Sequence, residues 1–276
     1  MPKTRHCWLR LAWIPSLSVA IFATGCLPFL RSTRTPMTVE VLAGSGTAPC
    51  TVLLLPGFWD RPSDFVRHGF AEEVATRNLD IRLLAADAHV GYYRKRTVLD
   101  EVRSIVKAER RAGRDVWLAG NSLGGVGALI YARHGGEDIE GALLMAPYLG
   151  EPETIAEIRA AGGVLAWAPP GSEPLDEEPE PQEDNALDRD EYARETWQWL
   201  AGWHRDGQGQ VEGSPRLWMG WGVDDDFAGP AEMAAALLPE GHARPAPGGH
   251  DWTAWTKNWR DFLDGGALRR CTRPSS

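Results

Sequence analysis

The sequence predicts an α/β fold in which a mainly parallel sheet is flanked by helices. Two observations predict it. Continuous apolar runs, typical of strands buried on both faces, recur along the chain. Segments with apolar residues at helical spacing lie between these runs. Because strands separated by helices are joined by right-handed crossovers, this alternation indicates a mainly parallel sheet, and 276 residues suffice for one large core.

The expected elements follow one another in a regular order. Buried strands are expected at residues 51–55, 81–86, 115–119, 139–145 and 216–220. Helices are expected at residues 98–106, 126–130 and 253–263. The repeated unit is therefore a strand followed by a helix, and no internal sequence repeat accompanies it.

One long segment, residues 150–212, interrupts this alternation between two expected strands. It begins with a helical pattern at 154–161, continues through an acidic, proline-rich piece at 169–184, and ends in a Trp-rich amphipathic stretch at 192–203. The acidic piece predicts a solvated loop. The flanking helices suggest a cap or lid insertion, with a peripheral helical excursion that has no role in a site as the alternative. The α/β core then comprises residues 38–149 and 213–276.

The first 26 residues have the pattern of an export signal. A basic start precedes a short apolar run at 11–23, which Pro15 interrupts, so a spanning helix is not expected. Residues 23–26, Ala-Thr-Gly-Cys, resemble the bacterial lipobox, in which the cysteine is lipidated, although that pattern prefers Leu at the position of Ala23. Ordinary cleavage and an uncleaved anchor stay open as alternatives to lipidation at Cys26.

The polar residues 27–37 suit a tether between a membrane and a folded body. We therefore expect an exported lipoprotein that is anchored in the membrane and faces the periplasm, or a soluble periplasmic or secreted protein if the lipobox is not used. Without residues 1–25, the chain has 26 basic and 38 acidic residues, a formal charge of −12. Such a surface repels nucleic acid, so a nucleic-acid-binding function is excluded.

Residues 120–124, Gly-Asn-Ser-Leu-Gly, match the pattern G-x-S-x-G. The motif directly follows an expected strand and directly precedes an expected helix, which is the setting of a nucleophile elbow. Small glycines let the strand and helix approach closely around a strained serine, and the helix N-terminus directs backbone N–H groups towards it. We expect Ser122 to be a nucleophile; the alternative is a Gly-rich turn with an ordinary N-cap serine.

Residues 55–59, Leu-Pro-Gly-Phe-Trp, end the first strong strand. Gly57 allows the chain to turn towards Ser122. A reaction at an acyl carbonyl needs backbone N–H groups that bind the developing oxyanion, and we assign this role to Phe58 N–H and Leu123 N–H. A simple strand-ending turn is the alternative.

Three adjacent aspartates follow the last expected strand. An acid just beyond a strand end can reach a histidine across the carboxyl edge of the sheet. The pattern G-x-x-D counted from Gly222 selects Asp225, with Asp224 as the second choice and Asp226 expected in solvent. A calcium loop would need acids at alternate residues and a glutamate, which this stretch lacks, so no metal site is expected.

Residues 248–252, Gly-Gly-His-Asp-Trp, form a glycine-rich loop before the last expected helix. A histidine on such a loop can reach Ser122, so His250 is the expected general base. His89, which follows a strand end, and His204, which lies in the expected cap, are the competitors. Each of these two is more typical of a surface or pocket histidine.

The order serine, aspartate, histidine and the context of each motif resemble the α/β-hydrolase superfamily from about residue 51 to residue 263. The G-x-x-D and G-G-H-D-W motifs are most similar to a bacterial, lipoprotein-like branch, which implies no particular substrate. Two features depart from the superfamily pattern. Pro56 stands where many relatives have His, and Pro245 and Pro247 interrupt the expected last strand, which should be short or irregular.

The resemblance implies a serine hydrolase that cleaves carboxylic esters through an acyl-enzyme, with Ser122 as nucleophile, His250 as base and Asp225 as orienting acid. No cofactor is implied. Thioesterase, lipase-like and acyltransferase activities would use the same residues, and a peptidase or a non-catalytic envelope binding lipoprotein also stays open. The Trp-rich cap suggests a small-molecule ester with an apolar part as substrate. The sequence does not indicate the oligomeric state.

The same fold would place Cys50 at the entry end of its strand and return the last helix to that end before Cys271. This proximity motivates the hypothesis of a disulfide between Cys50 and Cys271 in an exported protein. Two free thiols are the alternative.

Overall fold

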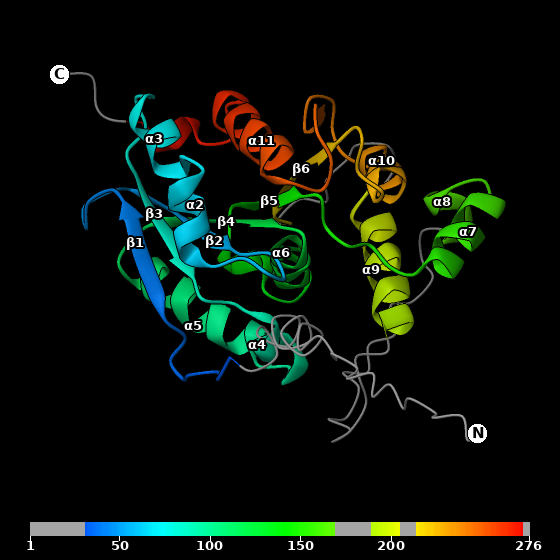
Figure 1. Cartoon of the computed structure of the whole chain (residues 1–276), viewed down its shortest axis with the longest axis horizontal. Helices are drawn as coiled ribbons and strands as arrows, with labels where there is room; N and C mark the ends of the chain where they lie inside the picture. The colour runs from blue at the N-terminus through cyan, green and yellow to red at the C-terminus, as the bar shows by residue number, and fades with distance from the viewer. Residues whose placement is uncertain (1–30, 169–188, 205–213, 273–276) are drawn as a thin grey trace, which may run out of the picture.

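The computed structural model describes residues 31–168, 189–204 and 214–272, with the side chains of 189–192 left out. Its centre is a seven-stranded sheet with the strand order β1-β3-β2-β4-β5-β6-β7 (Figure 1). The strands are β1 (Val39–Ala43), β2 (Cys50–Leu55), β3 (Ile81–Ala86), β4 (Asp115–Asn121), β5 (Gly141–Met145), β6 (Arg216–Gly222) and β7 (Ala243–Ala246). Strand β1 pairs antiparallel with β3, and the other neighbours pair in parallel. The predicted fold class is confirmed.

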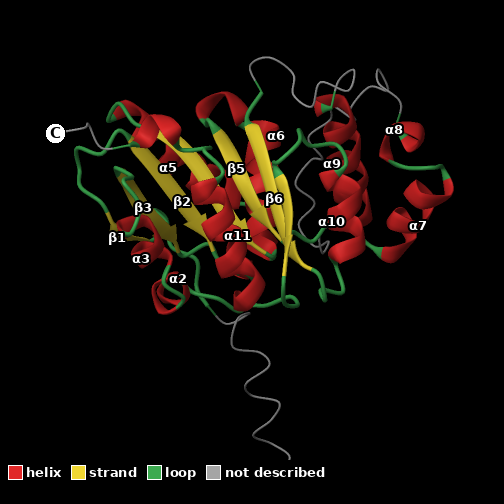
Figure 2. Cartoon of the chain, turned by 90° about the horizontal axis from the view of Figure 1, so that it is seen from above, coloured by secondary structure: helices red, strands yellow, loops and turns green. Residues whose placement is uncertain are grey.

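Helices cover both faces of this sheet, with α5 and α6 on one face and α3 and α11 on the other (Figures 1 and 2). In the first half of the chain the helices are α2 (Pro62–Arg67), α3 (Phe70–Ala75), α4 (Val90–Arg94), α5 (Val98–Arg111) and α6 (Leu123–His134). In the second half they are α7 (Pro152–Ala160), α8 (Val164–Trp167), α9 (Arg189–Trp203), α10 (Ala228–Ala235) and α11 (Trp252–Asp264). Short 3-10 turns occupy Gly136–Asp138 and Arg269–Cys271.

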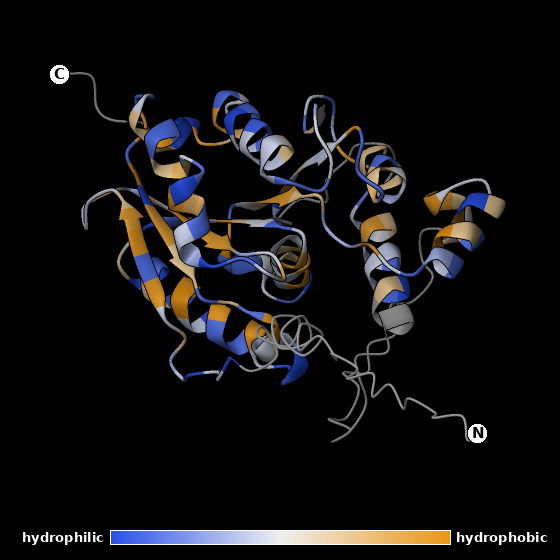
Figure 3. Cartoon of the chain, in the orientation of Figure 1, coloured by the Kyte–Doolittle hydropathy of each residue, from blue (hydrophilic) through white to orange (hydrophobic). Residues whose placement is uncertain are grey.

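The core forms because these elements follow the two periodicities of the sequence. Every residue of β2 and of β5 is buried, as expected for strands covered on both sides. Helix α5 alternates hydrophobic and hydrophilic residues (Figure 3) and buries Val98, Val102 and Val106. Helix α11 buries apolar side chains at positions i, i+4, i+7 and i+8, which are Trp255, Trp259, Phe262 and Leu263. The sheet is thus enclosed by helices that each bury one face.

The sequence does not predict either edge strand, β1 or β7, as a regular strand. Strand β1 has no fully buried residue, and Val41 on it is 53% exposed. Strand β7 has only four residues and contains Pro245, which removes one backbone donor. Both strands therefore lack the continuous apolar pattern that identifies the central strands, and β7 is short as the prolines predict.

The segment predicted as a cap contains α7, α8 and α9, while its acidic piece at 169–184 lies outside the described residues. Helices α7 and α8 lie beyond α9, at the end of the molecule away from β1 (Figures 1 and 2). Two tryptophans of α9 are buried and bind backbone carbonyls: Trp197 Nε1 donates to Leu149 O at 2.8 Å, and Trp203 Nε1 to Pro215 O at 3.2 Å. These indoles attach the insertion to the core, so neither is available to a substrate.

Residues 31–37 lie against the folded body instead of standing free. The backbone N–H and C=O of Arg34 each hydrogen bond Tyr92 Oη at 2.9 Å. The buried Glu101 accepts hydrogen bonds from Met37 N at 2.7 Å and from Thr35 Oγ1 at 2.6 Å. The expected tether over 27–37 therefore does not include residues 31–37, because two side chains about sixty residues away satisfy their polar groups.

A disulfide joins Cys50, the first residue of β2, to Cys271 near the end of the chain, the pairing proposed from the sequence. Both cysteines are buried. Nearby, Asp80 N donates to Cys271 O at 2.6 Å, which fixes the last turn beside the start of β3. Within the described residues, no helix is long and apolar enough to span a membrane.

We expect the double variant Cys50→Ala/Cys271→Ala to have a free energy of unfolding about 2–5 kcal/mol below that of the wild type, because the disulfide closes a loop across 221 residues and restricts the unfolded chain. Urea denaturation measures this difference. Alkylation of Cys50 or Cys271 in the unreduced wild-type protein, or equal stabilities of the two proteins, would contradict the prediction.

Candidate active site

Ser122 lies in a sharp turn between the end of β4 and the start of α6. Its φ of +51° is in the left-handed region, which is strained for any residue with a side chain. Two glycines make the turn possible. A Cβ on Gly120 would lie 2.1 Å from Gly124 O, and a Cβ on Gly124 would lie 1.9 Å from Leu55 O, so only glycine fits at either position. The chain therefore presents Ser122 at the carboxyl edge of the sheet.

His250 approaches Ser122 from the loop between β7 and α11. Ser122 Oγ lies 2.9 Å from His250 Nε2, within hydrogen-bond distance across 128 residues of sequence. The loop comes this close because β6 ends in a glycine: a Cβ on Gly222 would lie 2.3 Å from both Gly248 O and Gly249 O. The structure thus brings together the serine and the histidine that the motifs predict.

Asp251 fixes the same loop from its other side. Its carboxylate caps α11 by accepting from Thr253 N at 2.7 Å and Ala254 N at 3.3 Å, and it also accepts from Gly249 N at 3.3 Å. Burial raises the pKa of Asp251, but these hydrogen bonds outweigh it and the pKa is lowered on balance. The carboxylate is therefore ionised at neutral pH and holds the backbone on both sides of His250.

Asp225 is the aspartate that reaches His250. Its Oδ2 lies 2.8 Å from His250 Nδ1, and its Oδ1 accepts from Phe227 N at 2.8 Å. The side chain of Asp225 is completely buried, whereas Asp224 and Asp226 are exposed. Of the three adjacent aspartates, the structure therefore selects the one that the G-x-x-D pattern indicates.

Two aromatic rings border the imidazole of His250. The ring of Phe227 lies 5.1 Å away at 72°, and that of Trp255 lies 5.3 Å away at 88°, both edge-to-face. Tyr148 in turn packs against Phe227 with its ring centroid 5.7 Å away. The surroundings of His250 are therefore apolar on two sides, which limits its movement and strengthens its polar contacts.

The loop after β2 reaches the same edge because β2 and β4 are adjacent parallel strands. Leu55 pairs with Gly120, so Phe58 and Leu123 each follow the paired residues by three positions. Leu123 is the first residue of α6, where backbone N–H groups have no partner within the helix. The register is consistent with the predicted pair of backbone donors.

The competing histidines are engaged elsewhere. His89 is 1% exposed, and its Nδ1 accepts from Gly91 N at 3.1 Å as the N-cap of α4. His204 directly follows α9, and its Nδ1 lies 2.6 Å from Leu237 O. Neither contacts Ser122. Within the described residues, no group of three or more His, Cys, Asp or Glu side chains is arranged to hold a metal ion.

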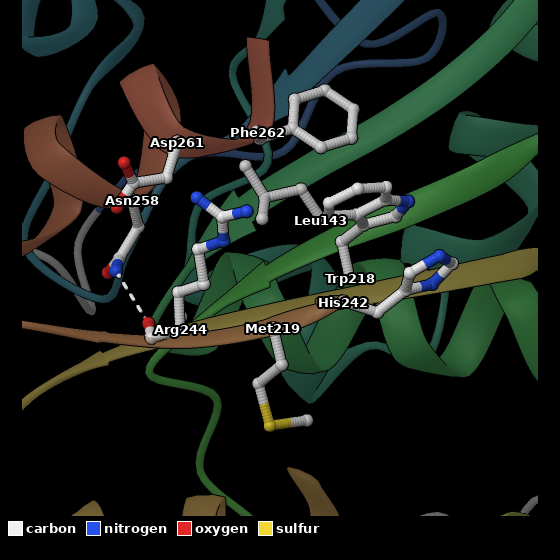
Figure 4. Close-up of a pocket in the computed structure, with 9 residues that line it drawn as sticks. Leu143, Trp218, Met219, His242, Arg244, Asn258, Asp261 and Phe262 are labelled. Carbon is white, nitrogen blue, oxygen red and sulfur yellow. Dashed lines mark hydrogen bonds between the residues drawn. The ribbon is translucent and has the colours of Figure 1, made fainter. Parts of the chain in front are cut away.

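Two cavities in the described structure lie away from Ser122. One, of about 10 Å³, lies between α11 and the strands β6 and β7 (Figure 4), where Asn258 Nδ2 donates to Arg244 O at 3.2 Å. Burial lowers the pKa of His242 in its wall, so this ring stays neutral near pH 7. The other, of about 330 Å³, lies at the opposite edge of the sheet beside Gly44 and Ile81. The first is as small as a single water site, and no residue lining the second is Ser122, Asp225 or His250.

We expect Gly124→Ala to lower the free energy of unfolding by about 1–3 kcal/mol or more, since the added methyl group meets the backbone of Leu55 and the turn around Ser122 must shift. Gly202→Ala is the matched control. A Cβ on Gly202 in α9 meets nothing within 4 Å, so this change should be neutral or stabilise by up to about 1 kcal/mol. Equal thermal denaturation midpoints for the two variants would refute the steric argument.

Comparison with solved structures agrees with the fold. Several solved structures share the fold at 14% sequence identity. A ferulic acid esterase has a TM-score of 0.55, covering 84% of this chain and 97% of its own. Est1E from Butyrivibrio proteoclasticus has a TM-score of 0.52 with coverages of 84% and 94%, and S-formylglutathione hydrolase (FrmB) from Staphylococcus aureus has 0.50 with 85% and 84%.

A search of curated proteins finds no match to this sequence. The model of the Esterase family, described as "Putative esterase", matches residues 85–263. This match covers more than half of the chain and includes Ser122, Asp225 and His250. The chain therefore belongs to the Esterase family and is a hydrolase with the α/β-hydrolase fold.

Proposed function

We propose that the protein hydrolyses carboxylic esters through an acyl-enzyme on Ser122, with His250 as general base and Asp225 as the acid that orients it. The observation that carries the proposal is the unbroken chain of two hydrogen bonds, 2.9 Å from Ser122 Oγ to His250 Nε2 and 2.8 Å from His250 Nδ1 to Asp225 Oδ2. Membership of an esterase family supports the reaction class.

The hydrogen bonds of Asp225 support one tautomer of His250. An ionised carboxylate only accepts hydrogen bonds, and Oδ1 already accepts from Phe227 N. Its Oδ2 therefore faces a protonated Nδ1, which leaves Nε2 of the neutral ring as the acceptor for the hydroxyl of Ser122. This is the arrangement that removes a proton from the serine as it attacks.

The reaction then proceeds in two steps. Ser122 Oγ bonds to the acyl carbon while His250 takes the hydroxyl proton and passes it to the departing alcohol. Water, deprotonated by His250, next attacks the acyl carbon; the bond from this carbon to Ser122 Oγ breaks, His250 returns the proton to Oγ, and the acid is released. The N–H groups of Phe58 and Leu123 bind the oxyanion in both steps. These residues complete the reaction without a cofactor.

We also propose that the substrate is a small ester with an apolar part. The support comes from the loops and not from the buried tryptophans of α9. Phe227 and Tyr148 pack beside His250, and Trp59, next to Phe58, is 63% exposed at the same edge of the sheet. Aromatic side chains around a reactive serine favour an apolar acyl or alcohol group.

The sequence of residues 1–26 supports export and lipidation at Cys26, which we propose as the way this enzyme is held at the periplasmic face of a membrane. Cys26 lies outside the described residues. Arg31 forms an ion pair with Asp87, which directly follows β3 at the carboxyl edge of the sheet. Five residues of extended chain span at most about 18 Å, so an anchor on Cys26 would keep this edge close to the lipid.

Fluorophosphonate labelling tests the proposed nucleophile. We expect the wild type to be labelled and Ser122→Ala to remain unlabelled, and we expect Asp225→Asn and His250→Ala to lower kcat at least about 10³-fold because the proton acceptor is misoriented or lost. Labelling of Ser122→Ala would identify another serine. An unlabelled wild type that still binds apolar esters would favour a binding protein.

The same preparation distinguishes the activities that share this mechanism. Kinetic constants for p-nitrophenyl esters graded by acyl length, for matched thioesters and amides, and for transfer to an added alcohol would identify the acyl donor and acceptor. We expect esters to be cleaved fastest and kcat/KM to rise with acyl length. Equal values across the series would contradict the apolar substrate.

Incorporation of labelled palmitate tests the anchor. We expect the label in the exported wild-type protein and not in Cys26→Ala, because only a cysteine at that position can be acylated in a lipobox. Cys7→Ala is the matched control and should keep the label. Release of the unlabelled wild-type protein into the soluble periplasmic fraction would show that the signal is cleaved in the ordinary way.

A further inference from the structure

Asp60 connects three segments at the carboxyl edge of the sheet: its own loop after β2, the end of β4 and the start of α11. Its Oδ2 accepts from Asn121 Nδ2 at 2.7 Å, and its Oδ1 accepts from Trp252 Nε1 at 3.3 Å. Asn121 directly precedes Ser122, and Trp252 follows His250 by two residues. A single carboxylate therefore contacts a near neighbour of the serine and a near neighbour of the histidine.

The backbone of Asp60 closes the turn that contains Phe58. Asp60 N donates to Gly57 O at 3.2 Å, so Phe58 and Trp59 are the two central residues of a tight turn. A Cβ on Gly57 would lie 2.5 Å from Asp60 Oδ2 and 2.8 Å from Asn121 Nδ2. Position 57 therefore requires glycine for a reason other than the turn. A side chain there would collide with the hydrogen bond between Asp60 and Asn121.

Asn121 makes this contact hard to replace. Its side chain is completely buried, and its amide N–H₂ group donates to Asp60, which lies in the loop after β2 that contains Phe58. A buried amide donor needs a partner, and a carboxylate is a stronger acceptor than a neutral oxygen. The distance from Asn121 to Asp60 thus sets the position of the loop relative to the turn that holds Ser122.

We propose that Asp60 is a positioning residue that holds the backbone N–H of Phe58 in place relative to Ser122. This inference rests on the proposed function, since it concerns the oxyanion site of the same reaction. Asp60 acts through Phe58, Asn121 and Trp252 and does not itself touch the reacting atoms. Its expected effect is on the transition state, because the oxyanion forms only as the carbonyl is attacked.

The central test compares Asp60→Ala with the wild type in steady-state ester hydrolysis. Loss of an oxyanion donor costs about 10²–10³-fold in kcat, and a displaced donor costs less, so we expect a fall of about 10–100-fold with KM within about threefold. Asp60→Asn keeps the size of the side chain, but its single oxygen can accept from only one of the two donors. The kcat of this variant should therefore lie between those of Asp60→Ala and the wild type. Asp226→Asn, an exposed acid at the same edge, is the control for charge and should keep wild-type kcat.

A second comparison separates positioning from a general loss of stability. Asp60→Ala leaves the buried amide of Asn121 without its acceptor, so this variant should unfold at a lower temperature. The double variant Asp60→Ala/Asn121→Ala removes both groups and should recover part of the thermal stability while its kcat stays low. If kcat recovers together with the melting temperature, Asp60 has only a structural role and the proposal is overturned.

Hydrogen exchange of residues 57–60 provides a measurement that does not depend on activity. We expect exchange in this loop to be at least several-fold faster in Asp60→Ala than in the wild type. Exchange in α9, which is distant in sequence from the loop, should be unchanged. Unchanged exchange in the loop, or unchanged kcat in Asp60→Ala, would overturn the role of Asp60. If the wild type fails to react with fluorophosphonate but the loop still loosens in the variant, the proposed function fails while the placement of the loop by Asp60 stands.

Discussion

The close contact between the backbone of Leu55 and Gly124 is the constraint on which the rest of the site depends. Strands β2 and β4 are adjacent and parallel, so their ends arrive at the same edge, and α6 must start almost on top of the end of β2. Only a residue without a side chain allows this. The result is a turn that holds Ser122 at a φ of +51° and places the start of α6 beside the loop after β2. Every other part of the site is arranged around that fixed point.

Three carboxylates, one buried (Asp225), one partly buried (Asp60) and one exposed (Asp251), hold the remaining loops. Asp225 binds His250 and the backbone of Phe227, Asp251 binds the backbone on both sides of His250, and Asp60 binds Asn121 and Trp252. Asp225 and Asp60 each accept from two partners, and Asp251 accepts from three backbone N–H groups. Charge-assisted hydrogen bonds of this kind restrict a loop more strongly than neutral ones, and they do so without closing the edge of the sheet to a substrate. An acidic protein thus uses part of its negative charge to organise the site.

The central strands, the long helices and the serine and histidine motifs could be predicted because each produces a local pattern. Strand β2 is a continuous apolar run, and α5 repeats valines at helical spacing. The edge strands β1 and β7 produce weak patterns because one of their sides faces solvent or a proline replaces a donor. The tryptophans of α9 suggested a substrate surface, but two of them fill the core and bind backbone carbonyls. Composition indicates that a segment is apolar, and only packing decides what it covers.

The sequence by itself determined the order of strands and helices and the presence of a serine in a strand–turn–helix motif, because these depend on neighbours in the chain. The tertiary structure decided the distances at which Ser122, His250 and Asp225 meet, which part of residues 27–37 lies on the body, and that Asp60 joins the loop after β2 to the end of β4 and the start of α11. These contacts connect residues 25 to 192 positions apart. The register of the sheet and the direction of each side chain set them, and the spacing of residues along the chain indicated only the aspartate at position 225.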